Sequence, residues 1–224
     1  MADRQLDFLV VNPQAKPTAA VIWLHGLGVD GHDFEPIVPE LQLPDSLPIR
    51  FVFPHAPKRA VTINFNMIMP AWFDILDIAG PHKVKVDDIL ESSRQLVDLI
   101  QSETRHGLPP DRIILAGFSQ GGTIALHTGL RYDKKLAGIM ALSTYLPTVD
   151  QLEDERSEAN RDIPIFMAHG TSDPLIGIEN AVRTRKALSR LGYNIRWQEY
   201  PVEHTVCHEE IQDIRSWILD ILGY

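Results

Sequence analysis

Short apolar runs alternate with longer segments of helical periodicity along the whole chain. Most of these runs are nearly continuous rather than alternating, which is typical of strands that are covered on both faces of a sheet. We predict six strands, at Ala19–Leu24, Ile49–Phe53, Arg112–Ala116, Leu136–Leu142, Ile163–Ala168 and Ile195–Tyr200.

Three segments between the runs carry apolar residues at helical spacing. The first lies around Ile89–Ile100, the second ends at Gly192, and the third covers Ile211–Ile221. Alternating strands and helices predict βαβ units, and therefore an α/β fold whose mainly parallel sheet has helices on both faces. The polar stretch from Asp150 to Asp162 is interpreted as a surface loop or a short helix. With no repeat or linker in the sequence, we expect residues 1–224 to form a single domain.

Composition narrows the class of protein. The 224 residues include one cysteine, so no intramolecular disulfide can form and a reducing compartment is expected. The net charge of −9 argues against a nucleic-acid partner. The N-terminus does not have the pattern of a secretory signal, and no apolar run approaches the roughly 20 residues that span a bilayer. We therefore expect a cytoplasmic protein with no integral membrane association.

Two glycine motifs suggest different chemistries. Gly26–Gly31 fits the G-x-G-x-x-G pattern of a dinucleotide site and follows a predicted strand. However, Asp30 and Asp33 would repel a phosphate, and the acidic residue expected about 20 positions later is missing. A nucleotide cofactor is therefore the less favoured hypothesis.

The second motif, Gly117–Gly121, has the pattern G-x-S-x-G around Ser119. It lies between a predicted strand and a predicted helix, which is the arrangement of the nucleophile elbow in α/β-hydrolases. A strained serine backbone requires neighbours without Cβ atoms, so that the helix can pack closely on the strand. The alternative is a glycine-rich turn with an exposed serine.

A serine hydroxyl needs a base to attack at neutral pH, and in this fold an acid and then a histidine follow the serine. Asp173 and His204 each follow a later predicted strand, so parallel strands would bring both to the same sheet edge as Ser119. Asp173 could instead cap a turn, and His204 could be a surface histidine. His208 is the rival base, but it falls inside the last predicted helix.

Acyl transfer also needs two donors aimed at the developing oxyanion. In this fold one is the N–H of the residue after the nucleophile, which is Gln120, and the other comes from the loop after an earlier strand. We expect Leu27 to supply the second donor. This mechanism uses both glycine motifs.

Two other patterns in the sequence bear on metal and substrate binding. His204 and His208 are four residues apart with Cys207 between them, but no third ligand has metal spacing, so we predict no metal site. The segment 61–73 is apolar yet poorly periodic. We interpret it as an apolar wall for an acyl chain, with substrate-binding residues Phe65, Met67, Met69 and Trp72. Plain core is the alternative.

Several motifs resemble the bacterial carboxylesterases of the phospholipase/carboxylesterase family, which also includes the acyl-protein thioesterases. The similarity extends in order over essentially the whole chain, through residues 24–28, 69–75, 115–122, 141–145 and 197–201. It implies an α/β-hydrolase without a cap domain, a triad of Ser119, Asp173 and His204, no cofactor, and a possible homodimer. The chain departs from the family pattern at Glu203, where glycine is usual before the catalytic histidine, and at a bulkier loop around Phe65–Ile68.

These observations together predict a serine carboxylesterase that hydrolyses small-molecule esters with short to medium acyl chains through an acyl-enzyme. The alternative is an acyl-protein thioesterase or lysophospholipase that acts on long acyl chains. More remote alternatives are a non-catalytic binding module and a metal-dependent hydrolase.

Overall fold

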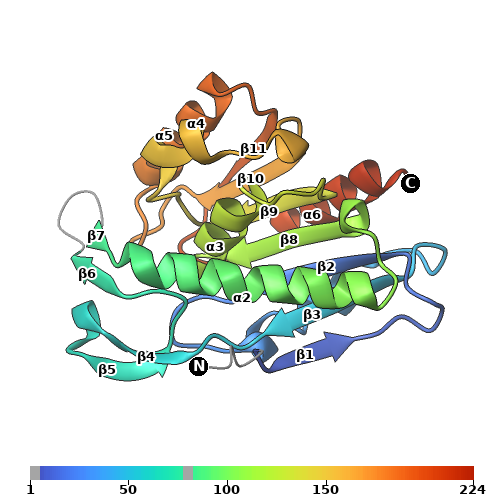
Figure 1. Cartoon of the computed structure of the whole chain (residues 1–224), viewed down its shortest axis with the longest axis horizontal. Helices are drawn as coiled ribbons and strands as arrows, with labels where there is room; N and C mark the ends of the chain where they lie inside the picture. The colour runs from blue at the N-terminus through green and yellow to red at the C-terminus, as the bar shows by residue number, and fades with distance from the viewer. Residues whose placement is uncertain (1–5, 78–82) are drawn as a thin grey trace.

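A mainly parallel β-sheet forms the middle layer of the protein in a computed structural model, which describes residues 6–77 and 83–224 (Figure 1). The strands of this sheet are β1 (Phe8–Val11), β2 (Ala19–Leu24), β3 (Ile49–Pro54), β8 (Ile113–Phe118), β9 (Gly138–Leu142), β10 (Ile165–Gly170) and β11 (Ile195–Tyr200). Within the described part the sheet has seven strands, in the order β1-β3-β2-β8-β9-β10-β11. β1 is antiparallel to β3 at one edge, and the other neighbours pair in parallel.

Helices cover both faces of this sheet. The helices are α1 (Ile37–Glu40), α2 (Val86–Arg105), α3 (Gln120–Gly129), α4 (Leu152–Glu155), α5 (Ile178–Arg190) and α6 (His208–Leu222). α2, α3 and α5 contribute to the apolar core on one face, and α1 and α6 contribute to the core on the other. α2 runs across the front of the sheet in Figure 1, and every residue of α3 is buried. The predicted α/β architecture is confirmed. Among the described helices, none is long and apolar enough to cross a membrane.

All six predicted strands are present, the three helices predicted from periodicity correspond to α2, α5 and α6, and the helix predicted after Ser119 is α3. β1 and two small antiparallel pairs were not predicted. One pair is formed by β4 (Lys58–Val61) and β5 (Met67–Pro70), and the other by β6 (Ile75–Asp77) and β7 (Lys83–Val84). Both pairs lie outside the main sheet, toward the left in Figure 1.

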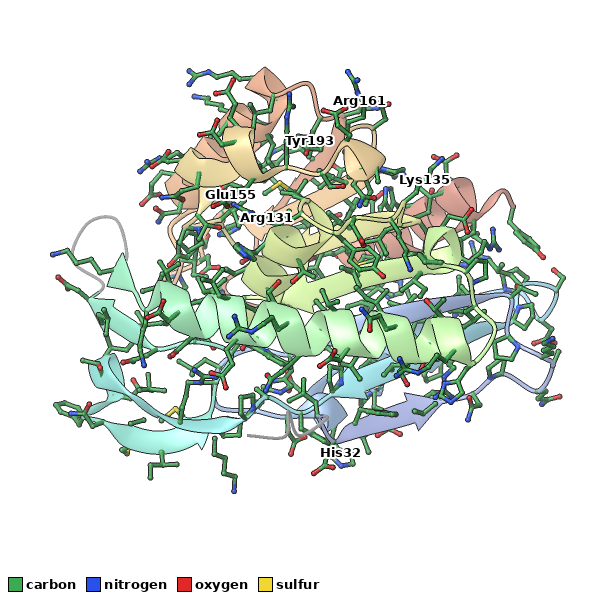
Figure 2. The ribbon with its side chains drawn as sticks, viewed as in Figure 1. His32, Arg131, Lys135, Glu155, Arg161 and Tyr193 are labelled. Carbon is green, nitrogen blue, oxygen red and sulfur yellow. The ribbon has the colours of Figure 1, made fainter. Side chains whose placement is uncertain are left out.

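The polar stretch from Asp150 to Asp162 is a series of short helical turns around α4, as predicted. It is attached to the end of α3 by an ion pair between Arg131 and Glu155, whose closest N···O distance is 2.7 Å. Figure 2 shows these two labelled residues next to one another. The ion pair therefore holds α4 close to the end of α3.

Candidate active site

Ser119 lies in a sharp turn between β8 and α3. Its backbone has φ 55° and ψ −122°, a left-handed φ that is strained for a residue with a side chain. Its N–H donates to the carbonyl of Leu142 at 2.9 Å, which fixes the turn to β9. A Cβ on Gly117 would lie 2.2 Å from the backbone of Gly121, and one on Gly121 would lie 2.3 Å from the carbonyl oxygen of Leu24. The glycines thus allow the close strand–helix packing that the elbow requires.

Asp173 and His204 meet at the carboxyl ends of β10 and β11. Oδ2 of Asp173 lies 2.6 Å from Nδ1 of His204, and Oδ1 accepts hydrogen bonds of 2.9 Å from the N–H groups of Leu175 and Ile176. Burial alone would raise the pKa of Asp173, but the hydrogen bonds from His204 and the two N–H groups outweigh it and lower the pKa. Asp173 is therefore an anion that both caps a turn and orients a histidine.

One cavity of about 420 Å³ joins these groups, because Ser119 and His204 both line it. The rings of His204 and Phe118, the residue before the serine, are 4.6 Å apart. The lining is mostly apolar, and its members are Gly26, Leu27, Val29, Asp33, Ile63, Asn64, Phe73, Ile75, Phe118, Ser119, Gln120, Thr123, Tyr145, Pro174, Leu175, Ile176 and His204. An apolar pocket of this size with a few convergent polar groups is typical of a small-molecule site.

A second histidine, His169, is fully buried and also lies beside Asp173. Nε2 of His169 lies 2.8 Å from the carbonyl oxygen of Ile176 and 3.4 Å from Oδ2 of Asp173, so it carries the proton. Nδ1 of His169 is buried without a hydrogen-bond partner among the described residues. Burial lowers the pKa of His169, which is consequently neutral.

The two predicted oxyanion donors both line the cavity. Gln120 is the first residue of α3, so its N–H has no partner within the helix. In the described part of the chain, the N–H of Leu27 donates to no backbone carbonyl, whereas the N–H of the next residue, Gly28, donates to the carbonyl of Pro70 at 2.9 Å. Two free N–H groups therefore border the space in front of Ser119.

His25 fixes the loop that carries Leu27. Its Nδ1 lies 2.7 Å from the carbonyl oxygen of Gly26, and its Nε2 accepts from the N–H of Ala56 at 3.0 Å. Because a carbonyl only accepts, Nδ1 carries the proton. Burial lowers the pKa of His25, so the ring is neutral and helps to orient this loop.

None of the four residues of the predicted apolar wall lines the cavity. Phe65 and Met67 are 91% and 56% exposed at the β4–β5 turn. Met69 lies behind the lining residue Asn64, with 3.3 Å between its Sδ and Nδ2 of the asparagine. Trp72 is fully buried and belongs to the core. The segment does contribute to the cavity, but through other residues.

Several further lining residues were not predicted from the sequence. Ile63, Phe73 and Ile75 lie on or beside the two small hairpins, while Tyr145 and Leu175 follow β9 and β10. Leu175 could have been predicted as a lining residue from the sequence, because it follows Asp173 by two positions. The contribution of Ile63 depends on the hairpin, which sequence periodicity did not indicate.

The other candidates have structural roles. Asp30 accepts from the N–H of His32 at 2.9 Å and so caps a short helical turn. Cys207 is half-buried at the beginning of α6, and His208 is the first residue of that helix. Among residues 6–77 and 83–224, no group of three or more histidine, cysteine or acidic side chains is arranged to hold a metal ion.

Comparisons with known proteins show the family of this chain. A family model described as Phospholipase/Carboxylesterase matches residues 6–221. Acyl-protein thioesterase 1 of Neurospora crassa is 40% identical over 223 residues, covering 96% of this chain and 91% of the relative. Acyl-protein thioesterase 1 of Cryptococcus neoformans is 37% identical over 235 residues, covering 97% and 98%. The crystal structure of Zea mays acyl-protein thioesterase 2 has a TM-score of 0.85 at 26% identity, covering 97% of this chain and 99% of the maize chain.

These relatives are eukaryotic, so the comparisons support the wider family and not its bacterial carboxylesterases. The matched family and the α/β-hydrolase fold identify a serine hydrolase whose substrates are esters or thioesters. The chain therefore belongs to the phospholipase/carboxylesterase family.

Proposed function

We propose that the protein is an acyl-protein thioesterase, which hydrolyses long-chain acyl thioesters through an acyl-enzyme formed on Ser119. In this mechanism His204 takes the proton of Ser119 during attack and returns it to the leaving thiolate. Asp173 keeps Nδ1 of His204 protonated and stabilises its cation. The N–H groups of Leu27 and Gln120 hold the oxyanion of the tetrahedral intermediate. Water then releases the acyl group by the same steps.

The observation that carries this proposal is the apolar cavity of about 420 Å³ that contains Ser119 and His204. Each methylene group buried in such a cavity contributes about 0.8 kcal/mol of binding free energy. The acyl chain is thus the part of the substrate that this lining recognises best. The names of the fungal relatives support the same reading, so we favour it over the short-chain carboxylesterase that the motifs suggested.

A paired rate series tests the chain-length and thioester preference. The value of kcat/KM is measured for oxyesters and thioesters with acyl chains from two to sixteen carbons. We expect kcat/KM to rise with chain length and to be highest for long-chain thioesters. A maximum at two to six carbons would instead establish a short-chain esterase.

The nucleophile is tested with Ser119→Ala on a p-nitrophenyl ester and with a fluorophosphonate probe. Ser143 provides a matched control, since it is a second buried serine with a positive φ, 46°, directly after β9. We expect Ser119→Ala to lose turnover and labelling, and Ser143→Ala to keep both. Wild-type turnover in Ser119→Ala would contradict the mechanism, and failure of the probe to label Ser119 in wild-type protein would favour a binding module.

Three expectations stay predictions: a single domain over residues 1–224, association into a homodimer, and a cytoplasmic location. Sedimentation of the purified chain measures the association state.

A further inference from the structure

Trp72 links parts of the site that are distant in sequence. It is fully buried, and its indole N–H donates to the carbonyl of His25 at 2.9 Å. Its backbone N–H donates to Oε1 of Gln120 at 2.9 Å, and its carbonyl accepts from Oγ of Ser92 at 2.5 Å. The residue therefore touches both the loop after β2 and the first turn of α3.

The side chain of Gln120 completes this connection. Its Nε2 donates to the carbonyl of Phe73 at 2.8 Å while its Oε1 accepts from Trp72, so both ends of the amide are used. Gln120 is 3% exposed, and these bonds are consequently shielded from water. The bond from Gly28 to Pro70 ties the other end of the oxyanion loop to the same segment.

From this network we propose that Trp72 is a positioning residue that sets the distance between the two oxyanion donors. The inference rests on the proposed function, in which Leu27 and Gln120 supply those donors. The segment 70–73 bonds to the loop of Leu27 on one side and to Gln120 on the other, so a shift at Trp72 moves one donor relative to the other. Oxyanion donors act only when they are held at hydrogen-bonding distance from the developing charge, and a misplacement of about 1 Å costs roughly 100-fold in rate.

The chain offers a matched control for this idea. Trp23 is also fully buried, lies in β2 two residues before His25, and stacks on Phe34 with 5.3 Å between ring centroids. Unlike that of Trp72, its indole N–H has no hydrogen-bond partner among the described residues. Trp72→Phe and Trp23→Phe therefore remove the same atoms from two cores, but only the first breaks a bond to the oxyanion loop.

The experiment measures kcat and KM on a p-nitrophenyl ester, the inhibition constant of an alkylboronic acid, and the thermal midpoint for both variants. The boronic acid forms a tetrahedral adduct with a nucleophilic serine and so reports on the oxyanion site. For Trp72→Phe we expect kcat to fall roughly 10- to 100-fold with KM unchanged, and boronic-acid binding to weaken in parallel. For Trp23→Phe we expect a similar drop in thermal midpoint, with kcat and boronic-acid binding within about twofold of wild type.

Equal effects of the two variants on kcat and boronic-acid binding would overturn the proposal and leave Trp72 an ordinary core residue. If Trp72→Phe does not fold, Gln120→Met tests the same network. This substitution keeps the backbone N–H of residue 120 and removes only the two side-chain hydrogen bonds to segment 70–73. A wild-type kcat in Gln120→Met would overturn the proposal. Neither result bears on the nucleophile, which Ser119→Ala tests separately.

Discussion

Oδ2 of Asp173 and Nδ1 of His204 lie 2.6 Å apart, while the other oxygen of the same carboxylate holds the turn that begins the cavity wall. Asp173 thus both caps a turn and pairs with the histidine, the two roles that its sequence position allowed. The two oxygens have separate tasks, so a substitution can remove one task and keep the other.

Asp173→Asn is expected to separate these tasks. The amide can still accept the N–H groups of Leu175 and Ile176 through Oδ1, so the thermal midpoint should change little. Without the negative charge, the protonated Nδ1 of His204 loses its partner, and kcat should fall roughly 10⁴-fold. The measurement is steady-state turnover of a p-nitrophenyl ester, with Asp150→Asn on the surface as the control. A decrease of less than tenfold would show that Asp173 is mainly a turn cap.

Gly121→Ala should damage both stability and catalysis. The added Cβ would lie 2.3 Å from the carbonyl oxygen of Leu24, a backbone atom that cannot move without displacing β2. We expect a loss of at least about 2 kcal/mol in the free energy of unfolding and a large loss of kcat. Gly107→Ala is the control, because its Cβ would meet no atom within 4 Å although φ is +97°. It should cost about 1–2 kcal/mol and leave kcat unchanged. Similar activity of the two variants would contradict this account of the elbow.

Glu210 should make the protein less stable as pH rises. Burial raises the pKa of this carboxyl from its ordinary value of 4.5 to about 8, with a smaller contribution from the charge of Asp213. Between these two values the folded chain keeps a proton that the unfolded chain has lost. The free energy of unfolding therefore falls with pH over that window, by up to about 1.4 kcal/mol per pH unit from this group.

Glu210→Gln removes this dependence, so the stability of the variant relative to wild type should increase from pH 5 to pH 8. Urea unfolding at three pH values measures it, with the exposed Glu209→Gln as the control. Parallel curves for wild type and Glu210→Gln would show that Glu210 ionises normally in the folded protein.

The residues that line the cavity should determine which acyl chain lengths the protein accepts. Phe65→Ser changes a side chain that is 91% exposed and outside the cavity, so kcat/KM for soluble esters should stay within about twofold. Ile63→Phe places a larger group in the lining and should lower kcat/KM for long acyl chains much more than for short ones. A chain-length series on both variants distinguishes them. A larger effect of Phe65→Ser than of Ile63→Phe on long acyl chains would instead support the apolar wall predicted from the sequence.

The sequence predicted the elements that are buried on both faces, because continuous apolar runs such as β8 have few alternative structures. It also predicted that Ser119, Asp173 and His204 would gather at one sheet edge, since parallel strands bring their carboxyl ends together. The hydrogen bond between Asp173 and His204 agrees with that expectation. Their catalytic roles are the subject of the experiments proposed above.

The sequence did not predict the elements whose structure depends on contacts outside themselves. β1 has only four half-buried residues, and the β4–β5 pair has left-handed backbone at Phe65 and Asn66 instead of a glycine turn. The segment 61–73 is mostly apolar, so its composition could not show that Phe65 is exposed and Trp72 is buried. That difference depends on which residues of the segment contact the core. Trp72 was therefore predicted to bind substrate, although its indole N–H donates to the carbonyl of His25, in the loop that carries Leu27.

β8, which ends at the sharp turn of Ser119, is fourth among the seven strands of the main sheet. The β4–β5 pair lies outside this sheet, and half of its eight residues are exposed. The central strands of a sheet open only with global unfolding, while exposed pairs open locally at much lower free energy. Amide hydrogens of β8 should therefore exchange slowest and those of β4 and β5 much sooner. In a denaturant titration, esterase activity should be lost before the circular dichroism of the sheet changes.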